Sequence, residues 1–237
     1  MNKKLQIENY KGFLFDLDGT LIPQIWPEAY CVYIKNHGGK PRRDKINHEI
    51  EEILVRNFSC PDINNTLYKE INSLYGIRGI HPSMSYKIVL DIAKDMWRGL
   101  SYKPGAPRFL NYLRERDIPM AIVTQSIPEE IEVLRDDNEN ICIVADIGYI
   151  FGSRIIDKNS VTKRKPDPEG FLKGTRLLGL TPADVLAFED TPIGVRAAKA
   201  AGLSVCAVYD IESADKWEEI KSLADYHIMS WEELQLN

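Results

Sequence analysis

The sequence lacks any long hydrophobic run. No stretch approaches the roughly 18 apolar residues that a membrane-spanning helix needs. The first apolar run, Phe13 to Phe15, is also too short for the core of a signal peptide, and mostly polar residues precede it. We therefore expect a soluble, cytoplasmic protein with no membrane partner.

The sequence also lacks an excess of positive charge and any close pair of cysteines. Thirty Lys and Arg residues stand against thirty-five Asp and Glu residues, a net charge of −5 at pH 7, so no global field attracts a nucleic-acid backbone. We expect no nucleic-acid partner, and any anionic ligand must be held by local cations. The cysteines are too scattered for a zinc site or a disulfide framework, so we expect reduced thiols at Cys31, Cys60, Cys142 and Cys206.

Repeats, low-complexity tracts and glycine-rich linkers are absent as well, so domain boundaries must come from changes in the hydrophobic pattern. From Ser101 onward, short apolar runs alternate with helical stretches, which is typical of an α/β fold with a parallel sheet and helices on both faces. The predicted strands are Gly12 to Leu17, Pro119 to Val123, Val185 to Phe188 and Leu203 to Val208. The predicted helices are Ala106 to Arg116, Pro128 to Asp136, Pro168 to Leu178 and Pro192 to Ala201.

Residues 23–100 follow a different pattern, with almost no strand-like run. The amphipathic segments in this region are Glu28 to Asn36, Lys45 to Val55, Ile63 to Leu74 and Met84 to Trp97. Because the first strand rejoins its sheet only after this region, we predict an all-helical domain, residues 23–100, inserted into a core of residues 1–22 and 101–237. Pro23 and the pair Pro104-Gly105 supply helix breakers at the two crossings.

Two acids follow the first predicted strand in the run Asp16-Leu17-Asp18-Gly19-Thr20. In open parallel sheets, ligands bind beyond the carboxyl ends of the strands, so polar residues at those ends are candidates for a site. The alternative is a simple hairpin, because Asp-Gly between apolar residues is a strong turn signal. No returning strand follows Thr20, which favours the functional interpretation.

Three further segments place polar groups at strand ends: Thr124-Gln125-Ser126, Lys165 and Glu189-Asp190. Taken singly, each has a plain structural alternative, namely a strand residue with a helix cap, a solvated surface lysine, and an exposed turn. The run Ser126-Ile127-Pro128-Glu129 in particular has the pattern of a capping box at a helix start. Together they bring acids, a hydroxyl and a cation to one edge of the sheet, which indicates a site for an anion.

In this order the set resembles the haloacid dehalogenase superfamily of phosphotransferases. It is similar to the branch with a helical cap after the first motif, which includes phosphoglycolate phosphatase and β-phosphoglucomutase. The resemblance covers the whole chain, and its four motifs are Asp16-Leu17-Asp18-Gly19-Thr20, Thr124, Lys165-Pro166 and Glu189-Asp190. It implies a Rossmann-like catalytic core, with residues 23–100 as the cap domain.

The resemblance further implies a magnesium-dependent phosphomonoester hydrolase that acts on a small soluble phosphorylated metabolite. Asp16 would be the nucleophile that forms an aspartyl phosphate, and Asp18 would be the general acid and base. The phosphate group would be bound by Gly19, Thr124, Gln125 and Lys165. Mg²⁺ would offset the negative charge, and it would be held by Asp16, the backbone carbonyl of Asp18 and Asp190, with Glu189 as an outer or alternative ligand.

Alternatives remain open within this resemblance. The acid at Asp18 disfavours dehalogenation, because dehalogenases of the superfamily lack an acid there. A sugar-phosphate mutase is disfavoured but not excluded, since this chain has Glu28 where such mutases tend to carry a histidine. A non-catalytic binding protein on the same fold would need no nucleophile. The basic cluster Lys40 to Lys45 either binds a second anionic group or is a solvated helix start, and the oligomeric state is not readable, although a monomer is compatible with the sequence.

Overall fold

A computed structural model describes residues 5–57 and 60–236 of the protein. The chain forms two compact units. The first, called the core unit here, consists of Met1–Gln24 and Arg98–Asn237, and the second, called the helical unit, consists of Ile25–Trp97. The boundaries predicted from the sequence lie at residues 22/23 and 100/101.

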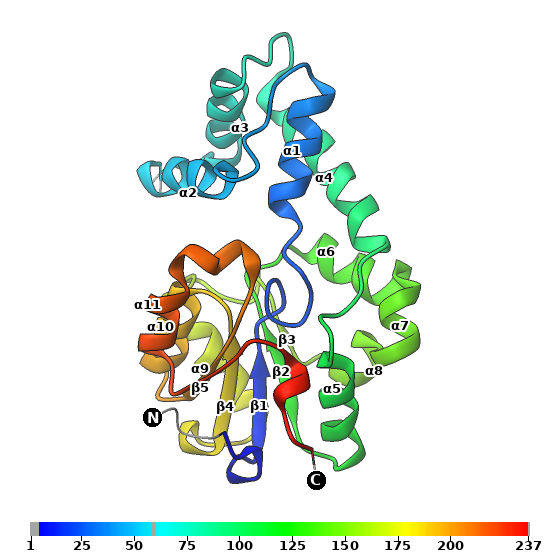
Figure 1. Cartoon of the computed structure of the whole chain (residues 1–237), viewed down its shortest axis with the longest axis vertical. Helices are drawn as coiled ribbons and strands as arrows, with labels where there is room; N and C mark the ends of the chain where they lie inside the picture. The colour runs from blue at the N-terminus through cyan, green and yellow to red at the C-terminus, as the bar shows by residue number, and fades with distance from the viewer. Residues whose placement is uncertain (1–4, 58–59, 237) are drawn as a thin grey trace. The chain divides into compact units, whose positions relative to one another are not determined.

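The core unit is built on a six-stranded parallel sheet (Figure 1). Its strands are β1 (Gly12–Phe15), β2 (Met120–Val123), β3 (Ile155–Ile156), β4 (Val185–Glu189), β5 (Ser204–Val208) and β6 (Tyr226–Ile228), in the order β3-β2-β1-β4-β5-β6. The chain builds one half of the sheet from β1 outward and then returns to the other side of β1 with β4. Such a reversal of strand order is where α/β sheets bind ligands. The predicted α/β fold with a parallel sheet is confirmed.

The central strand β1 is buried on both faces. Successive side chains of a strand alternate between faces, so Phe13 and Phe15 lie on one side and Leu14 on the other. Phe15 stacks on Phe188 of β4 with 5.4 Å between ring centroids, and both Phe13 and Phe15 contact Phe109 edge-on. Leu14 belongs to a separate apolar cluster of buried residues. A strand buried on both faces reads as a continuous apolar run, which is why β1 was predictable.

Helices cover both faces of this sheet (Figure 1). The helices of the core unit are α5 (Ala106–Glu115), α6 (Pro128–Glu132), α7 (Glu139–Ala145), α8 (Ile147–Phe151), α9 (Glu169–Leu177), α10 (Pro192–Ala200) and α11 (Trp217–Leu223). Residues of α9, α10 and α11 pack with Leu14 in its cluster, whereas Phe109 of α5 and Phe151 of α8 pack on Phe15. Each face of β1 is therefore covered by its own layer.

The region of α6 differs from its prediction in two details. The predicted helix Pro128 to Asp136 is α6 followed by a wider π-helical turn, Val133–Asp137. The predicted capping box is also absent: Ile127 occupies the N-cap position and makes no side-chain cap bond. The hydroxyl of Ser126 is instead engaged by the side chains of Thr124 and Asp18. At the start of α10, by contrast, the Thr191 side chain caps the helix, since it accepts a hydrogen bond from the Gly194 N–H.

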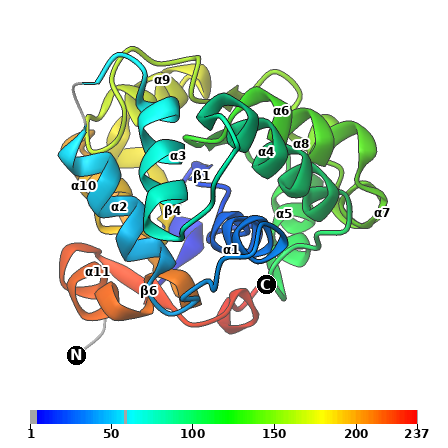
Figure 2. The same cartoon turned by 90° about the horizontal axis from the view of Figure 1, so that it is seen from above.

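The helical unit contains α1 (Trp26–Asn36), α2 (Ile46–Arg56), α3 (Ile63–Leu74) and most of α4 (Pro82–Arg98). The helices α2 and α3 lie side by side (Figure 2). The interior of this unit holds a neutral hydrogen-bonded triad. The Tyr33 hydroxyl lies 2.8 Å from Asn72 Oδ1 and 2.7 Å from Ser85 Oγ, and Asn72 Nδ2 donates to Ser85 Oγ at 2.8 Å. All three side chains are buried.

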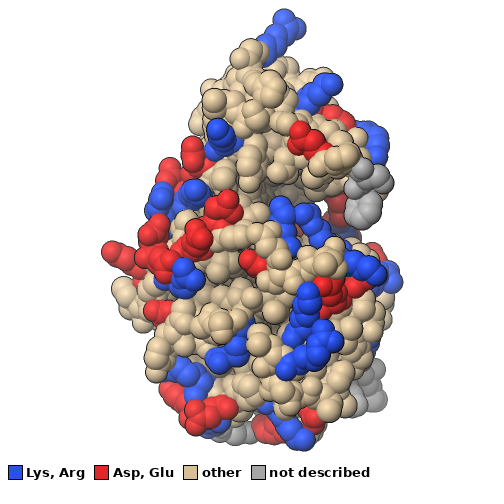
Figure 3. Space-filling view, turned by 180° about the vertical axis from the view of Figure 1, so that it is seen from behind, with Lys and Arg blue, Asp and Glu red and all other residues tan. Residues whose placement is uncertain are grey.

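The remaining structural expectations concern membranes, thiols and surface charge. Among the described residues, no helix is both long enough and apolar enough to span a bilayer. All four cysteines are free thiols, as predicted. On the face drawn in Figure 3, positive and negative side chains both occur, in keeping with the modest net charge.

Candidate active site

The carboxyl end of β1 leads directly into the first acidic motif. The Asp16 N–H still donates to Phe188 O at 3.0 Å, and the chain then turns, so the strand ends at Phe15 rather than at the predicted Leu17. The turn requires Gly19, whose φ is +80°. A Cβ there would lie 2.2 Å from Asp190 Oδ2. The segment after β1, residues 16–20, is called the β1 loop. Glycine at position 19 therefore lets the β1 loop pack against Asp190, the acid that follows β4.

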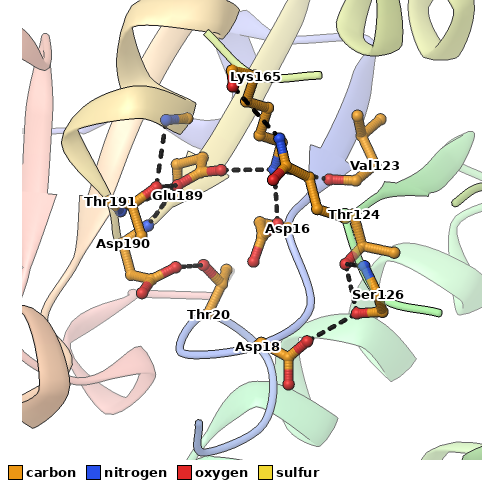
Figure 4. Close-up of polar contacts among 12 residues, drawn as sticks. Asp16, Asp18, Thr20, Val123, Thr124, Ser126, Lys165, Glu189, Asp190 and Thr191 are labelled. Atoms are coloured by element: carbon orange, nitrogen blue, oxygen red, sulfur yellow. Dashed lines mark hydrogen bonds and ion pairs between the residues drawn. The ribbon is translucent and has the colours of Figure 1, made fainter. Parts of the chain in front are cut away.

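Lys165 links the ends of three strands (Figure 4). It comes from the loop between β3 and α9, and its side chain is only 8% exposed. Its Nζ donates to Asp16 Oδ1 at 2.6 Å, to Glu189 Oε1 at 2.6 Å and to Val123 O at 3.0 Å. A residue more than a hundred positions from Asp16 along the chain is thus an ion-pair partner of its carboxylate.

Glu189, the last residue of β4, and Asp190, which follows it, have different surroundings. Both oxygens of Glu189 are engaged, because Oε1 accepts from Lys165 and Oε2 accepts from the N–H groups of Asp190 and Thr191, each at 2.9 Å. Asp190 accepts one hydrogen bond from Thr20 Oγ1 at 2.9 Å and faces Gly19 with its other oxygen. Asp190 therefore lies beside the β1 loop, whereas Glu189 anchors the lysine.

The second motif connects to Asp18 through Ser126. Thr124 follows β2, and its Oγ1 accepts from the Ser126 N–H at 3.0 Å. The two hydroxyl oxygens lie 2.6 Å apart, and Ser126 Oγ donates to Asp18 Oδ2 at 2.6 Å. Gln125 Nε2 lies 3.5 Å from the backbone carbonyl of Lys165. The structure thus brings all the predicted site residues to one edge of the sheet and adds Ser126.

Lys103 is a further residue that sequence reasoning missed. Its Nζ donates to the backbone carbonyls of Gly19 at 2.5 Å and Tyr209 at 2.6 Å, and to Asp210 Oδ2 at 3.0 Å. These contacts tie the β1 loop to the segment after β5. In the sequence, Lys103 is one basic residue before Pro104, and nothing there distinguishes it from a solvated lysine.

The site carries more buried negative charge than its lysine can balance. Burial raises the pKa of Asp16 to about 8, with Lys165 opposing this rise and Glu189 adding to it. Burial, followed by Glu189 and Asp16, raises the pKa of Asp190 well above its usual range. Burial alone would lower the pKa of Lys165, but Asp16 and Glu189 hold it above its usual value, so its ammonium stays charged. One ammonium group is therefore shared by several carboxyl groups.

This donor set suits a hard divalent cation. No group of three or more His, Cys, Asp and Glu side chains within residues 5–57 and 60–236 is arranged to hold a metal. The predicted ligand set needs only two carboxylates, Asp16 and Asp190, together with the carbonyl of Asp18, and all three donors are oxygens. Both carboxyl groups are buried beside a single ammonium group, and such a cation would favour their ionised form. The residues present fit Mg²⁺.

A parallel α/β core with acids and a lysine at this edge of the sheet is the arrangement found in one family of hydrolases. Residues 10–202 match the model of the haloacid dehalogenase-like hydrolases, so the chain belongs to that family. It is similar to hexitol phosphatase A of Escherichia coli, with 30% identity over 210 residues, 84% of this chain and 82% of that protein. It is also similar to validoxylamine A 7′-phosphate phosphatase of Streptomyces hygroscopicus subsp. limoneus, with 27% identity over 196 residues, 82% and 83% of the two chains.

Solved structures agree on the fold. CbbY from Rhodobacter sphaeroides, determined in complex with phosphate, superposes with a TM-score of 0.68 at 21% identity, covering 95% of this chain and 96% of that one. The sequence predicted an enzyme, namely a phosphatase of this superfamily. The family match and the named relatives confirm this prediction.

Proposed function

We propose that the protein is a magnesium-dependent phosphomonoester hydrolase that acts through an aspartyl phosphate on Asp16. The observation that carries this proposal is the bridge made by Lys165 Nζ, 2.6 Å from both Asp16 and Glu189, at the reversal point of the sheet. A buried ammonium beside a carboxylate fixes the carboxylate's orientation and offers positive charge to a transferring phosphoryl group.

Asp16 is proposed as the nucleophile. One of its oxygens forms a bond to phosphorus while the bond from phosphorus to the alcohol oxygen breaks, and the alcohol takes a proton from Asp18. In the second step, water attacks phosphorus and gives a proton to Asp18, while the bond from phosphorus to the Asp16 oxygen breaks. This releases inorganic phosphate and restores the Asp16 carboxylate. Asp18 is oriented for both transfers by the hydroxyl of Ser126.

The phosphate oxygens are proposed to be bound by Lys165, by the hydroxyl of Thr124 and by groups at Gly19 and Gln125. The Gly19 segment is held in place by Lys103 and by the packing of Asp190 against its Cα. Binding groups that are already fixed lose little entropy when the substrate arrives, so this rigidity favours the transition state.

Asp16, Asp190 and the carbonyl of Asp18 are the proposed ligands of Mg²⁺. When bound, the metal would offset the repulsion between the buried carboxylates and a phosphate dianion. Glu189 was predicted as an outer or alternative ligand. Because both of its oxygens are engaged, we instead propose that its role is to hold Lys165.

The helical unit is proposed as the cap that selects the organic part of the substrate. The relatives named above are a hexitol phosphatase and a validoxylamine A 7′-phosphate phosphatase. We therefore propose a small polyol or sugar phosphate as the substrate class.

A panel of phosphate esters, assayed with Mg²⁺ and with a chelator, tests the proposal. It should include alkyl, polyol and hexose 1-phosphates, and each reaction should be analysed for free phosphate and for isomerised sugar. Release of phosphate that stops with chelator is the expected result. Isomerisation without phosphate release would instead indicate a mutase, and no reaction on any ester would indicate a binding protein.

A further inference from the structure

Three oxygen atoms converge on the ammonium group of Lys103. Its Nζ donates to the backbone carbonyls of Gly19 at 2.5 Å and Tyr209 at 2.6 Å, and to Asp210 Oδ2 at 3.0 Å. An ammonium group has three N–H donors, one for each of these oxygens. The side chain is only 16% exposed. Backbone carbonyl oxygens gathered around one positive charge are also how proteins hold K⁺, so the contacts have the composition of a monovalent-cation site.

The oxygens that follow β5 are fixed independently of Lys103. Asp210 is buried, and its other oxygen, Oδ1, accepts from the Glu212 N–H at 2.9 Å. The N–H of Tyr209 donates to Ile228 O of β6 at 2.9 Å. A carboxylate and a carbonyl oxygen that point at one spot repel each other unless a positive charge lies between them. Lys103 supplies that charge from the segment before α5.

The same lysine holds the backbone at the end of the β1 loop. The Gly19 carbonyl accepts from its Nζ, and the Leu21 carbonyl accepts from its backbone N–H at 2.8 Å. Between these two, the Thr20 carbonyl accepts from Trp231 Nε1 at 3.0 Å. Three successive carbonyl groups are thus bonded to donors from distant segments, and Lys103 provides two of the three donors.

We propose that Lys103 is a positioning residue whose ammonium group acts as a built-in monovalent cation, binding the β1 loop to the segment after β5. It acts through Gly19 on the adjacent Asp18, the proposed general acid and base, so its effect on activity rests on the proposed function. A simple ion pair with Asp210 would need neither carbonyl contact, yet two of the three partners are neutral carbonyl groups. When the side chain is truncated, the three oxygens should therefore accept a free cation of ammonium size.

Chemical rescue of Lys103→Ala provides the test, because this variant removes the ammonium group and leaves all three oxygens. The first assay uses tetramethylammonium chloride, whose cation is too large for the site. In this salt, kcat for a phosphate ester should fall by about 10- to 100-fold and KM should change by less than about 3-fold, because Asp18 is misplaced. Ammonium or potassium chloride, at equal ionic strength and constant Mg²⁺, should raise kcat again by about 10-fold or more in a saturable manner.

Thermal unfolding without substrate tests the cation site separately from activity. Ammonium at about ten times its dissociation constant should raise the Tm of Lys103→Ala by about 3 °C or more over tetramethylammonium. Wild type and Lys103→Met should show neither this rise nor a recovery of kcat, because their side chains already fill the space. Lys199→Ala is the matched control, since it breaks a partly exposed pair with Asp225 and should not respond to ammonium in either assay.

An unchanged kcat in Lys103→Ala, a loss that neither ammonium nor potassium restores, or equal recovery in Lys103→Met would each overturn the role. If Lys103→Ala does not fold in any of the salts, Asp210→Asn carries the test. Folded Asp210→Asn with kcat lowered by about 10-fold or more would support the role, and an unchanged kcat would overturn it. A wild-type enzyme that cleaves no ester would contradict the proposed function, whereas the ammonium-dependent Tm would still test the cation site.

Discussion

The buried polar side chains of the two units differ in charge and in hydrogen bonding. In the helical unit, the triad of Tyr33, Asn72 and Ser85 is neutral, and each member is hydrogen-bonded to the other two. In the core unit, buried carboxyl groups crowd around Lys165, and oxygens of Asp18 and Glu130 have no donor. Satisfied neutral networks specify packing, whereas crowded charges are costly and are kept where chemistry needs them. The first network is expected to serve stability and the second to serve activity.

The largest expected effect comes from removing the nucleophile. Asp16→Asn keeps the size of the side chain and should lower phosphatase activity by at least about 10³-fold, because the amide is a poor nucleophile. The variant should unfold at a temperature close to that of wild type or higher, since it removes one buried negative charge. Retention of substantial turnover would show that the charged cluster does not act through Asp16.

Lys165→Met should affect both activity and stability. Loss of the ammonium leaves Asp16 and Glu189 buried without their cation, which should lower the free energy of unfolding by about 3 kcal/mol or more and abolish turnover. Urea denaturation at neutral pH measures the change. Lys199→Met is the control, because it breaks a partly exposed pair with Asp225 and should cost at most about 1 kcal/mol. Equal losses in the two variants would contradict the importance of the buried bridge.

Asp190→Asn should change the metal requirement more than the fold. The amide can still accept the hydrogen bond from Thr20, but it is a weaker ligand for Mg²⁺, so half-maximal activity should need about 10- to 100-fold more Mg²⁺. A magnesium titration of activity measures this shift, with the exposed Asp136→Asn as the control. An unchanged titration would place the metal ligand elsewhere.

The smallest expected effect lies in the helical unit. Tyr33→Phe removes a hydroxyl that bridges Asn72 and Ser85, and it should lower the free energy of unfolding by about 1–2 kcal/mol. Activity at a temperature where the variant is folded should be unchanged. Tyr149→Phe is the matched control, because that side chain is 74% exposed. A large loss of activity without loss of stability would contradict the claim that this triad serves stability and that only the carboxyl cluster serves activity.

The same division explains what was predictable from the sequence. The strands β1, β2, β4 and β5 consist mostly of apolar residues, as is typical of buried parallel strands, and polar residues at their ends marked the edge of the sheet. The edge strands β3 and β6 were missed because they have two and three residues, mostly half-buried, and so lack a periodic signal.

The contacts inside the site were less predictable than its location. Ser126 has the sequence pattern of a helix cap, but its hydroxyl bonds to Asp18, which lies 108 positions away, and this tertiary contact overrides the local pattern. Lys103 and Glu130 resemble surface residues in the sequence. The burial of Glu130 and the partial burial of Lys103 follow from the packing of distant segments, which no local pattern records.

The most direct test of the account is to trap the phosphorylated enzyme. Wild-type protein mixed with a rapidly cleaved phosphate ester and Mg²⁺ should be quenched with acid, digested and examined by mass spectrometry, beside Asp16→Asn treated in the same way. The account predicts one phosphorylated aspartate, Asp16, in wild type and no phosphorylation in the variant. A phosphate on another residue, or rapid turnover with no phosphorylated enzyme at any quench time, would contradict it.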